Sequence, residues 1–286
     1  MIIDFHTHTF PDKIAGSVIG KLQQLSRSRP FTDATNDGLR RSMEQAGIDL
    51  SILLPVMTNA GQVHKLNDLA ARINERWQET GLLSFGGMHP DVENYKEALN
   101  HVTELGLKGI KIHPAYQGAD FDDIRYLRII DKASELGLIV LTHAGWDIGI
   151  PGHNYCDTKH IQRVMREVGP DRLVLAHMGG WQDWKAVGEE LAGLPLYFDA
   201  SFSTGDIVPA PGTTRTPEES HNMNREQFIH LVRKLGTDRI LFATDCPWST
   251  PARELPLLDW AHLTPAEREQ VLSGNALRLL GALPSA

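Results

Sequence analysis

Residues 124–143 read IRYLRIIDKASELGLIVLTH and contain the unit from which the rest of the chain is built. Apolar residues recur at helical spacing up to Leu136, as on the buried face of an amphipathic helix. Gly137 follows, and glycine readily takes the left-handed conformation that ends a helix. The run Leu138–Leu141 is then apolar without alternation, which is typical of a strand buried on both faces of a parallel sheet. His143 lies at the carboxyl end of that strand.

This unit of helix, glycine and apolar strand recurs from one end of the chain to the other. Helical patterns lie between the strands, for example over residues 66–77, 95–105 and 228–235. The glycines that end the predicted helices are Gly47, Gly81, Gly106, Gly137, Gly169, Gly193 and Gly236. The apolar runs predict eight strands, namely Ile2–Phe5, Leu50–Val56, Leu82–Met88, Gly109–Ile112, Leu138–Leu141, Leu173–Ala176, Leu196–Phe198 and Ile240–Phe242.

Eight strand–helix units in series are the pattern of a (β/α)8 barrel, also called a TIM barrel. The alternative is an open, doubly wound sheet that binds a nucleotide. We favour the barrel because no glycine-rich phosphate loop follows the first strand, where Thr7–Pro11 stands instead. No linker divides the chain, so we expect a single α/β barrel domain over residues 1–286.

The composition excludes several classes of protein. The chain has 28 basic and 36 acidic residues, and the resulting net charge of −8 disfavours partners such as nucleic acids or anionic membranes. No apolar run approaches the roughly 20 residues that cross a bilayer, and the amino terminus lacks the pattern of a signal peptide. The two cysteines fit a reducing compartment. We therefore expect a cytoplasmic protein that acts on a small molecule.

Side chains that can ligate a metal lie at the predicted carboxyl ends of the strands. These residues are His6 and His8 on the first strand, His113 on the fourth, His143 on the fifth, His177 on the sixth and Asp245 after the eighth. In a barrel the carboxyl ends of all strands converge on one mouth, where catalytic groups collect. The sequence therefore predicts a functional site at this mouth.

The spacing of His6 and His8 has a physical reason. Side chains two residues apart on a strand point to the same side, so both imidazoles can reach one cation. Imidazoles with a carboxylate suit Zn²⁺, and also Fe²⁺, Mn²⁺ or Co²⁺. A lone His-x-His pair often only anchors a loop, but here several other strands also bring histidine or aspartate to the same rim. We therefore expect a divalent metal, first of all zinc.

The sequence resembles the amidohydrolase superfamily in the segments that carry these residues. They are Ile3-Asp-Phe-His6-Thr-His8, His143, His177 and Thr244-Asp245-Cys-Pro-Trp248. Within that superfamily it resembles the amidohydrolase-related branch, which includes the aminocarboxymuconate-semialdehyde decarboxylase group. The resemblance extends over nearly the whole chain. It implies a distorted (β/α)8 barrel with a catalytic divalent metal, usually zinc, bound as one ion or two.

The resemblance also implies roles for individual residues. It makes His6, His8, His143 and Asp245 the metal ligands, and His177 either the acid/base or a ligand of a second metal. Asp245 can also take the proton of a water activated at the metal, and His177 can polarise a carbonyl or carry a proton. We expect His177 and Asp245 to be the catalytic residues.

Lys111 lies two residues before His113, so both side chains are expected to face the mouth. Three interpretations of Lys111 remain open. In binuclear superfamily members a carboxylated lysine on the fourth strand bridges two metals, and Lys111 can do the same. It can instead contact an anionic substrate, or form a structural ion pair inside the barrel. His113, Trp146 and Trp248 are expected to contact substrate as well, although tryptophans of this kind also pack loops onto helices.

Two enzymatic functions fit these residues. The first is a metal-dependent hydrolase that cleaves an amide, ester or lactone bond of a small molecule through a metal-activated water. The second is a metal-dependent lyase, a non-oxidative decarboxylase or hydratase of a small carboxylic acid. A bridging Lys111 favours the hydrolase, and a single metal favours the lyase. A non-catalytic metal-binding protein is disfavoured because a closed structural site does not need His177. Barrels of this kind also often form homodimers.

Overall fold

The computed structural model describes residues 1–216, 219 and 221–283. Residues 217, 218, 220 and 284–286, which the predicted domain includes, lie outside this description. All strand pairs are parallel, in the orders β1-β2-β3 and β4-β5-β6-β7-β8-β9. The strands are β1 (Ile3–Thr7), β2 (Leu50–Leu53), β3 (Leu82–Ser84), β4 (Gly86–Gly87), β5 (Gly109–Ile112), β6 (Ile139–Thr142), β7 (Leu173–Leu175), β8 (Tyr197–Asp199) and β9 (Ile240–Leu241).

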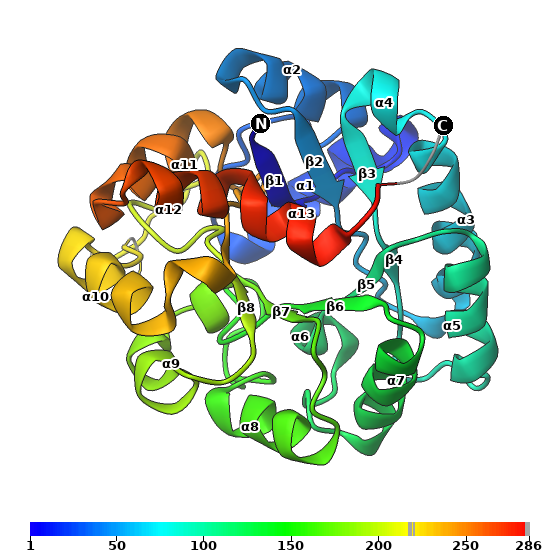
Figure 1. Ribbon diagram of the computed structural model, residues 1–286. Helices are drawn as coiled ribbons and strands as arrows, with labels where there is room; N and C mark the ends of the chain where they lie inside the picture. Colours follow the sequence, from blue (N-terminus) through cyan, green and yellow to red (C-terminus); the bar gives the residue numbers. More distant parts are fainter. Residues whose placement is uncertain (217–218, 220, 284–286) are drawn as a thin grey trace.

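Backbone hydrogen bonds beyond the strand ends join the first strand to the last. The amide of Phe5 donates to the carbonyl of Phe242 at 2.9 Å, and the amide of Asp245 donates to the carbonyl of His6 at 2.8 Å. The strands form a ring with the helices outside it (Figure 1). The prediction of a (β/α)8 barrel is therefore confirmed.

The third predicted strand, Leu82–Met88, is interrupted at Phe85. Two side chains of α3 (Val63–Asn74) replace strand partners there: Asn74 Oδ1 accepts from the Ser84 amide at 2.6 Å, and Asn67 Oδ1 accepts from the Gly87 amide at 2.9 Å. The Phe85 amide still donates to the carbonyl of Leu53 at 2.9 Å, so the ring stays connected. The two short pieces, β3 and β4, therefore occupy one barrel position.

Helices follow the strands as the sequence predicts. The seven glycines expected to end helices all have a positive φ, between 64° and 87°. Besides α3, the helices are α1 (Asp12–Ser26), α2 (Asn36–Ala46), α4 (Trp77–Thr80), α5 (Tyr95–Glu104), α6 (Pro114–Gln117), α7 (Ile124–Glu135), α8 (Thr158–Glu167), α9 (Trp184–Glu190), α10 (Arg225–Leu235), α11 (Pro251–Leu258), α12 (Pro265–Glu269) and α13 (Asn275–Leu280). Within the described residues, none of the helices combines the length and the apolar character that crossing a membrane requires.

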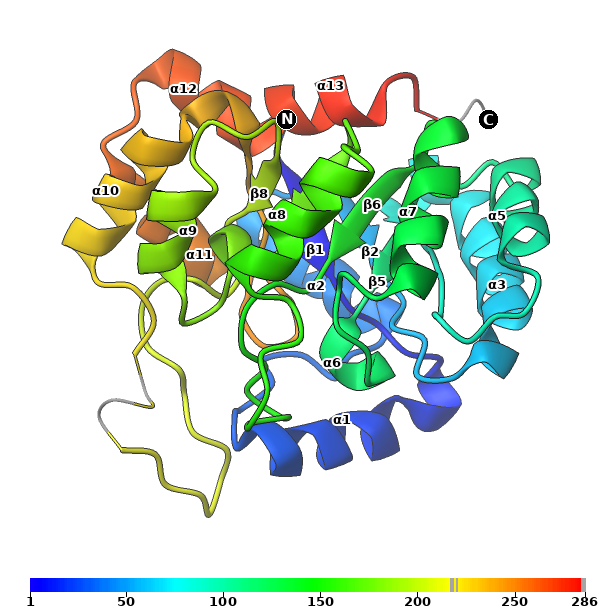
Figure 2. The same ribbon diagram turned by 90° about the horizontal axis from the view of Figure 1, so that it is seen from below.

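The inside of the barrel is apolar and closed at one end. Phe5, Ile52 and Leu141 belong to a buried cluster that also contains Ala276 and Leu279 of α13. Figure 2 shows α13 across one end of the molecule and α1 across the opposite end, next to α6. Because α13 seals the amino-terminal ends of the strands, polar groups inside the barrel are reached from the end that α1 covers.

The closure by α13 predicts an unequal response of two leucines on the same helix. Leu279 is 3% exposed and packs against the barrel interior, whereas Leu277 is 37% exposed. Leu279→Ala should lower the free energy of unfolding by about 2–5 kcal/mol because it leaves a cavity. Leu277→Ala should change it by less than about 0.5 kcal/mol. Urea denaturation measures both, and equal effects would contradict the packing described for α13.

Candidate metal centre and active site

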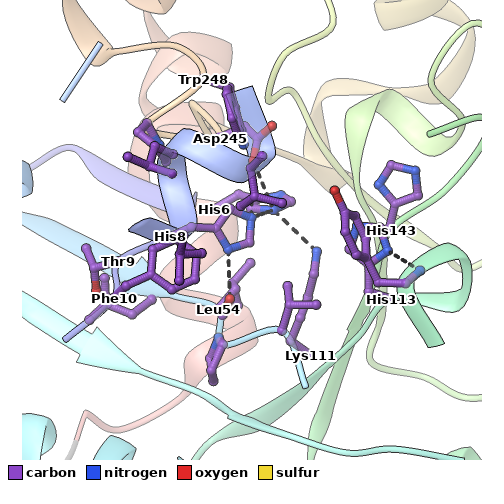
Figure 3. A pocket seen from close by; sticks show the side chains of 18 of the residues that line it. His6, His8, Thr9, Phe10, Leu54, Lys111, His113, His143, Asp245 and Trp248 are labelled. Carbon is purple, nitrogen blue, oxygen red and sulfur yellow. Dashed lines mark hydrogen bonds and ion pairs between the residues drawn. The ribbon is translucent and has the colours of Figure 1, made fainter. Parts of the chain in front are cut away.

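Three predicted ligands converge at the mouth of the barrel. His6 Nε2 and His8 Nε2 lie 3.0 Å apart, and Asp245 Oδ1 lies 3.2 Å from His8 Nε2 and 3.6 Å from His6 Nε2. His6 is on β1 and His8 directly beyond it, while Asp245 lies in the turn after β9 (Figure 3). The three ligand atoms lie within 4.8 Å of one another, close enough to hold one ion.

Hydrogen bonds on the other side of each imidazole fix its tautomer. His6 Nδ1 lies 2.8 Å from Asp199 Oδ2, and His8 Nδ1 lies 2.8 Å from the carbonyl oxygen of Leu54. Both oxygens can only accept, so both Nδ1 atoms donate and both Nε2 atoms present lone pairs. Two lone pairs and the Asp245 carboxylate oxygen thus face one another, an arrangement that a cation between them would stabilise. This donor set of two imidazoles and a carboxylate fits a divalent transition metal.

His143 and His177 form a second pair beside this centre. His143 Nε2 lies 3.1 Å from the carbonyl oxygen of Trp146, and His177 Nδ1 lies 3.0 Å from that of Ser201. By the same logic, His143 Nδ1 and His177 Nε2 present lone pairs to each other at 3.2 Å. The rings of His177 and His6 are 5.4 Å apart between centroids. The structure therefore places His143 with His177, next to the other three predicted ligands.

His113, His143 and Asp147 also lie within 4.8 Å of one another. The His113 ring stacks on His143 at 4.4 Å, and its Nε2 lies 3.6 Å from Asp147 Oδ2. His113 Nδ1 accepts a hydrogen bond from the Tyr116 amide, which leaves the proton on Nε2. This set is therefore a histidine–aspartate contact, and it is less suited to a metal than the first centre.

Burial sets the protonation states of these groups. It lowers the pKa of His143 and of His177 to about 4, and that of His6 well below its usual value. Burial by itself raises the pKa of Asp245, but the hydrogen bond with His8 and the attraction of His6 bring it down to about 2. At neutral pH the imidazoles of His6, His143 and His177 are therefore neutral and the Asp245 carboxylate is ionised, which are the forms that bind metals.

Lys111 lies between His6 and His8 on one side and His113 and His143 on the other (Figure 3). It lies on β5, is 1% exposed, and its Nζ is 3.3 Å from His6 Nε2. Among the described residues no carboxylate oxygen lies within 4.0 Å of Nζ, so the structural ion pair is not found. Burial lowers the pKa of Lys111 to about 8. A bridging role and a contact with an anionic substrate both remain open.

Asp199 and Ser201 were not predicted as site residues. Asp199, at the end of β8, binds His6 through Oδ2 and accepts from Ser201 Oγ at 2.5 Å and from the His177 amide at 3.1 Å through Oδ1. One carboxylate thus orients a residue of each histidine group. Asp199 directly follows the seventh predicted strand, Leu196–Phe198, so the rule that selected Asp245 could also have selected it.

A cavity of about 480 Å³ opens on the centre. The four residues expected to contact substrate, Lys111, His113, Trp146 and Trp248, all line it, together with Trp181 and residues of α1. His177 and Asp245, which border the cavity, have positive φ values of 57° and 61°. Such backbone is uncommon outside glycine and clusters at functional sites.

Comparisons with known proteins identify the family of the chain and solved structures of similar fold. The sequence model of the amidohydrolase family matches residues 3–282. A search of curated proteins finds no significant match. Each solved structure described next has at most 17% sequence identity and therefore establishes similarity of fold.

A 2,6-dihydroxybenzoate decarboxylase in complex with 2,6-dihydroxybenzoate is 16% identical, with a TM-score of 0.66 and coverage of 98% of this chain and 99% of that chain. A dihydroxybenzoic acid decarboxylase from Polaromonas sp. JS666, with bound manganese and the inhibitor 2-nitroresorcinol, is 15% identical, with a TM-score of 0.68 and coverage of 99% and 98%. A putative 2-pyrone-4,6-dicarboxylic acid hydrolase from Pseudomonas putida is 17% identical, with a TM-score of 0.63 and coverage of 98% and 97%.

The contact between His6 and Asp199 predicts a loss of metal affinity in Asp199→Asn. The asparagine amide would donate to His6 Nδ1, which moves the imidazole proton to Nε2, where the metal should bind. We expect zinc or manganese affinity to fall about 10- to 100-fold, measured by competition with a chelating dye. Asp206→Asn, an exposed carboxylate bound to His221, is the matched control. Equal affinities of the two variants would rule out this role for Asp199.

Proposed function

The chain belongs to the amidohydrolase family, and from this premise we propose that it is a divalent-metal-dependent lyase that removes the carboxyl group of a small carboxylic acid. The observation that carries the proposal is the convergence of lone pairs from His6, His8 and Asp245 beside His177, at the base of a ligand-sized cavity. Two solved structures of similar fold are decarboxylases of dihydroxybenzoates, and one of them holds manganese. These similarities support the lyase over the hydrolase.

His6, His8 and Asp245 would hold the metal, and His143, which faces His177, is a further ligand only as a proposal. When bound, a divalent ion supplies a Lewis acid for a substrate oxygen. Zinc stays a prediction for this chain, and manganese is the ion of the similar decarboxylase. Asp199 and the Leu54 carbonyl keep the two imidazoles in the ligating tautomer.

Non-oxidative decarboxylation breaks the bond between the carboxyl carbon and its neighbour, releases CO₂ and places a proton on that neighbouring carbon. We assign the proton transfer to His177 Nε2. The hydrogen bond from Nδ1 to the Ser201 carbonyl fixes the ring, and the Trp184 indole donates to the His177 carbonyl at 2.9 Å. At neutral pH Nε2 carries a lone pair, so it would first take up from solvent the proton that it then passes to the carbon. Because burial lowers the pKa of His177 to about 4, the imidazolium formed in this way gives up its proton readily.

The hydrolase remains a second candidate because of Lys111. Its buried amine lies beside His6 with no carboxylate partner among the described residues. Its lowered pKa of about 8 increases the fraction of the neutral amine, the form that reacts with CO₂. A carboxylated Lys111 would bridge two metals, which is the arrangement that favours hydrolysis of an amide, ester or lactone.

The lyase proposal predicts CO₂ release from aromatic or unsaturated carboxylic acids by protein reconstituted with zinc or manganese, and loss of this activity after chelation. His177→Ala should keep most of its metal, yet its kcat should fall at least 100-fold. His230→Ala on the exposed side of α10 is the control. An unchanged rate in His177→Ala would refute the assigned role. Hydrolysis of esters or lactones without any CO₂ release would refute the lyase.

Metal stoichiometry separates the two candidates independently of any substrate. For the lyase we expect about one ion per chain by elemental analysis, in the wild type and in Lys111→Met alike. For the hydrolase, two ions per chain should fall to about one in Lys111→Met. A carbamate on Lys111 in the mass spectrum of the native protein would then support the hydrolase.

A further inference from the structure

Helix α1 covers the mouth of the barrel with an apolar face. It lies across the end opposite α13 (Figure 2), and Val18, Ile19 and Leu22 line the cavity and are half-buried. Of the whole helix only Ala15 and Ser26 are buried. An amphipathic helix normally hides its apolar stripe in the core. Here the stripe faces the cavity, so the cavity has a hydrophobic roof.

A second part of the lining of the same cavity is also apolar. Leu66 and Leu69 of α3 line it together with Val56. A dry cavity of about 150 Å³ already accepts benzene, and this cavity has about 480 Å³. The space is therefore about three times what one aromatic ring needs, and the additional space lies between hydrophobic side chains.

The charges around the cavity allow one anionic group. Lys111 is the only lysine among the described residues that line it, and no arginine does so. Asp12 and Asp147 are acidic residues of the same lining. A substrate with one carboxylate finds Lys111 and the metal centre, whereas a second carboxylate would have no further lysine or arginine to pair with among the described lining residues.

We infer that the substrate is a monocarboxylic acid with an extended apolar group, an alkyl chain or a second ring. This group lies between α1 and α3 while the carboxylate reaches the centre formed by His6, His8 and Asp245. Val18, Ile19 and Leu22 then determine specificity. The inference rests on the proposed function for the position of the carboxylate, but the apolar wall is an independent observation.

The build of α1 allows such a group to enter. Gly16 and Gly20 stand inside the helix, and a Cβ at either position would meet no atom within 4 Å. Interior glycines weaken a helix, and nothing in their surroundings requires them to be glycine. The N-cap residue of α1, Pro11, also makes no side-chain capping bond. These features weaken the helix that covers the cavity.

Binding of a homologous series tests the inference without needing turnover. We would titrate metal-loaded protein with benzoate, 4-butylbenzoate, 4-octylbenzoate and terephthalate by calorimetry. Affinity should rise at least tenfold from benzoate to 4-butylbenzoate because buried methylenes leave water. Terephthalate, with its second carboxylate, should bind at least tenfold more weakly than 4-butylbenzoate. Affinity independent of the alkyl chain would overturn the inference.

Variants of α1 test whether the gain in affinity from the alkyl chain depends on this helix. Leu22→Asp should abolish the gain from the alkyl chain, so that 4-butylbenzoate binds no more tightly than benzoate, at unchanged metal content. Gln24→Asp introduces the same charge on the exposed side of the helix and is the control. Leu22→Trp fills part of the cavity instead. It should lower the affinity for 4-octylbenzoate at least tenfold but not the affinity for benzoate. An equal loss in Leu22→Asp and Gln24→Asp would overturn the assignment.

The failures of the two proposals can be told apart. If no acid is decarboxylated but affinity follows the alkyl chain and depends on Leu22, the lyase fails and the apolar subsite stands. If CO₂ is released but the affinity does not depend on the alkyl chain, the apolar subsite is refuted and the lyase function is supported. A change of oligomeric state in Leu22→Asp at constant affinity for the series would assign the apolar face to a second copy of the chain.

Discussion

The arrangement depends on one constraint: parallel strands in a closed barrel bring all their carboxyl ends to one rim. Residues that are up to 239 positions apart, such as His6 and Asp245, therefore meet within 3.6 Å. The apolar barrel beneath them, closed by α13, removes water from the imidazoles of His6, His143 and His177 and keeps these three neutral. Convergence and desolvation together produce a set of lone pairs that a divalent cation can satisfy.

The part of the fold that follows periodicity could be predicted from the sequence. The helix-ending glycines, the eight strand positions and the histidines at their ends each leave a local signal. The break at Phe85 leaves none, because it depends on Asn67 and Asn74, which reach the strand from a separate helix. The position of α1 over the mouth likewise depends on tertiary packing, although its apolar residues are visible in the sequence.

The residue types of the candidate site could be predicted from the sequence. Which of these residues contact one another could be predicted only in part. Spacing brings His6 and His8 to one point, and the structure agrees. Sequence spacing does not predict that His143 faces His177, nor that Asp199 binds His6 and the His177 amide. These contacts depend on how deep each residue lies at the rim. Lys111 is ambiguous for a related reason: its position is fixed, but its chemical state depends on the ions around it.

The central claim is that His6, His8 and Asp245 share one cation. A crystal structure of the protein grown with manganese or zinc, with anomalous data at the metal edge, tests it most directly. The account predicts an ion about 2.0–2.2 Å from His6 Nε2, His8 Nε2 and an Asp245 carboxylate oxygen. An ion bound elsewhere at the mouth, with Asp245 turned away from both imidazoles, would contradict it.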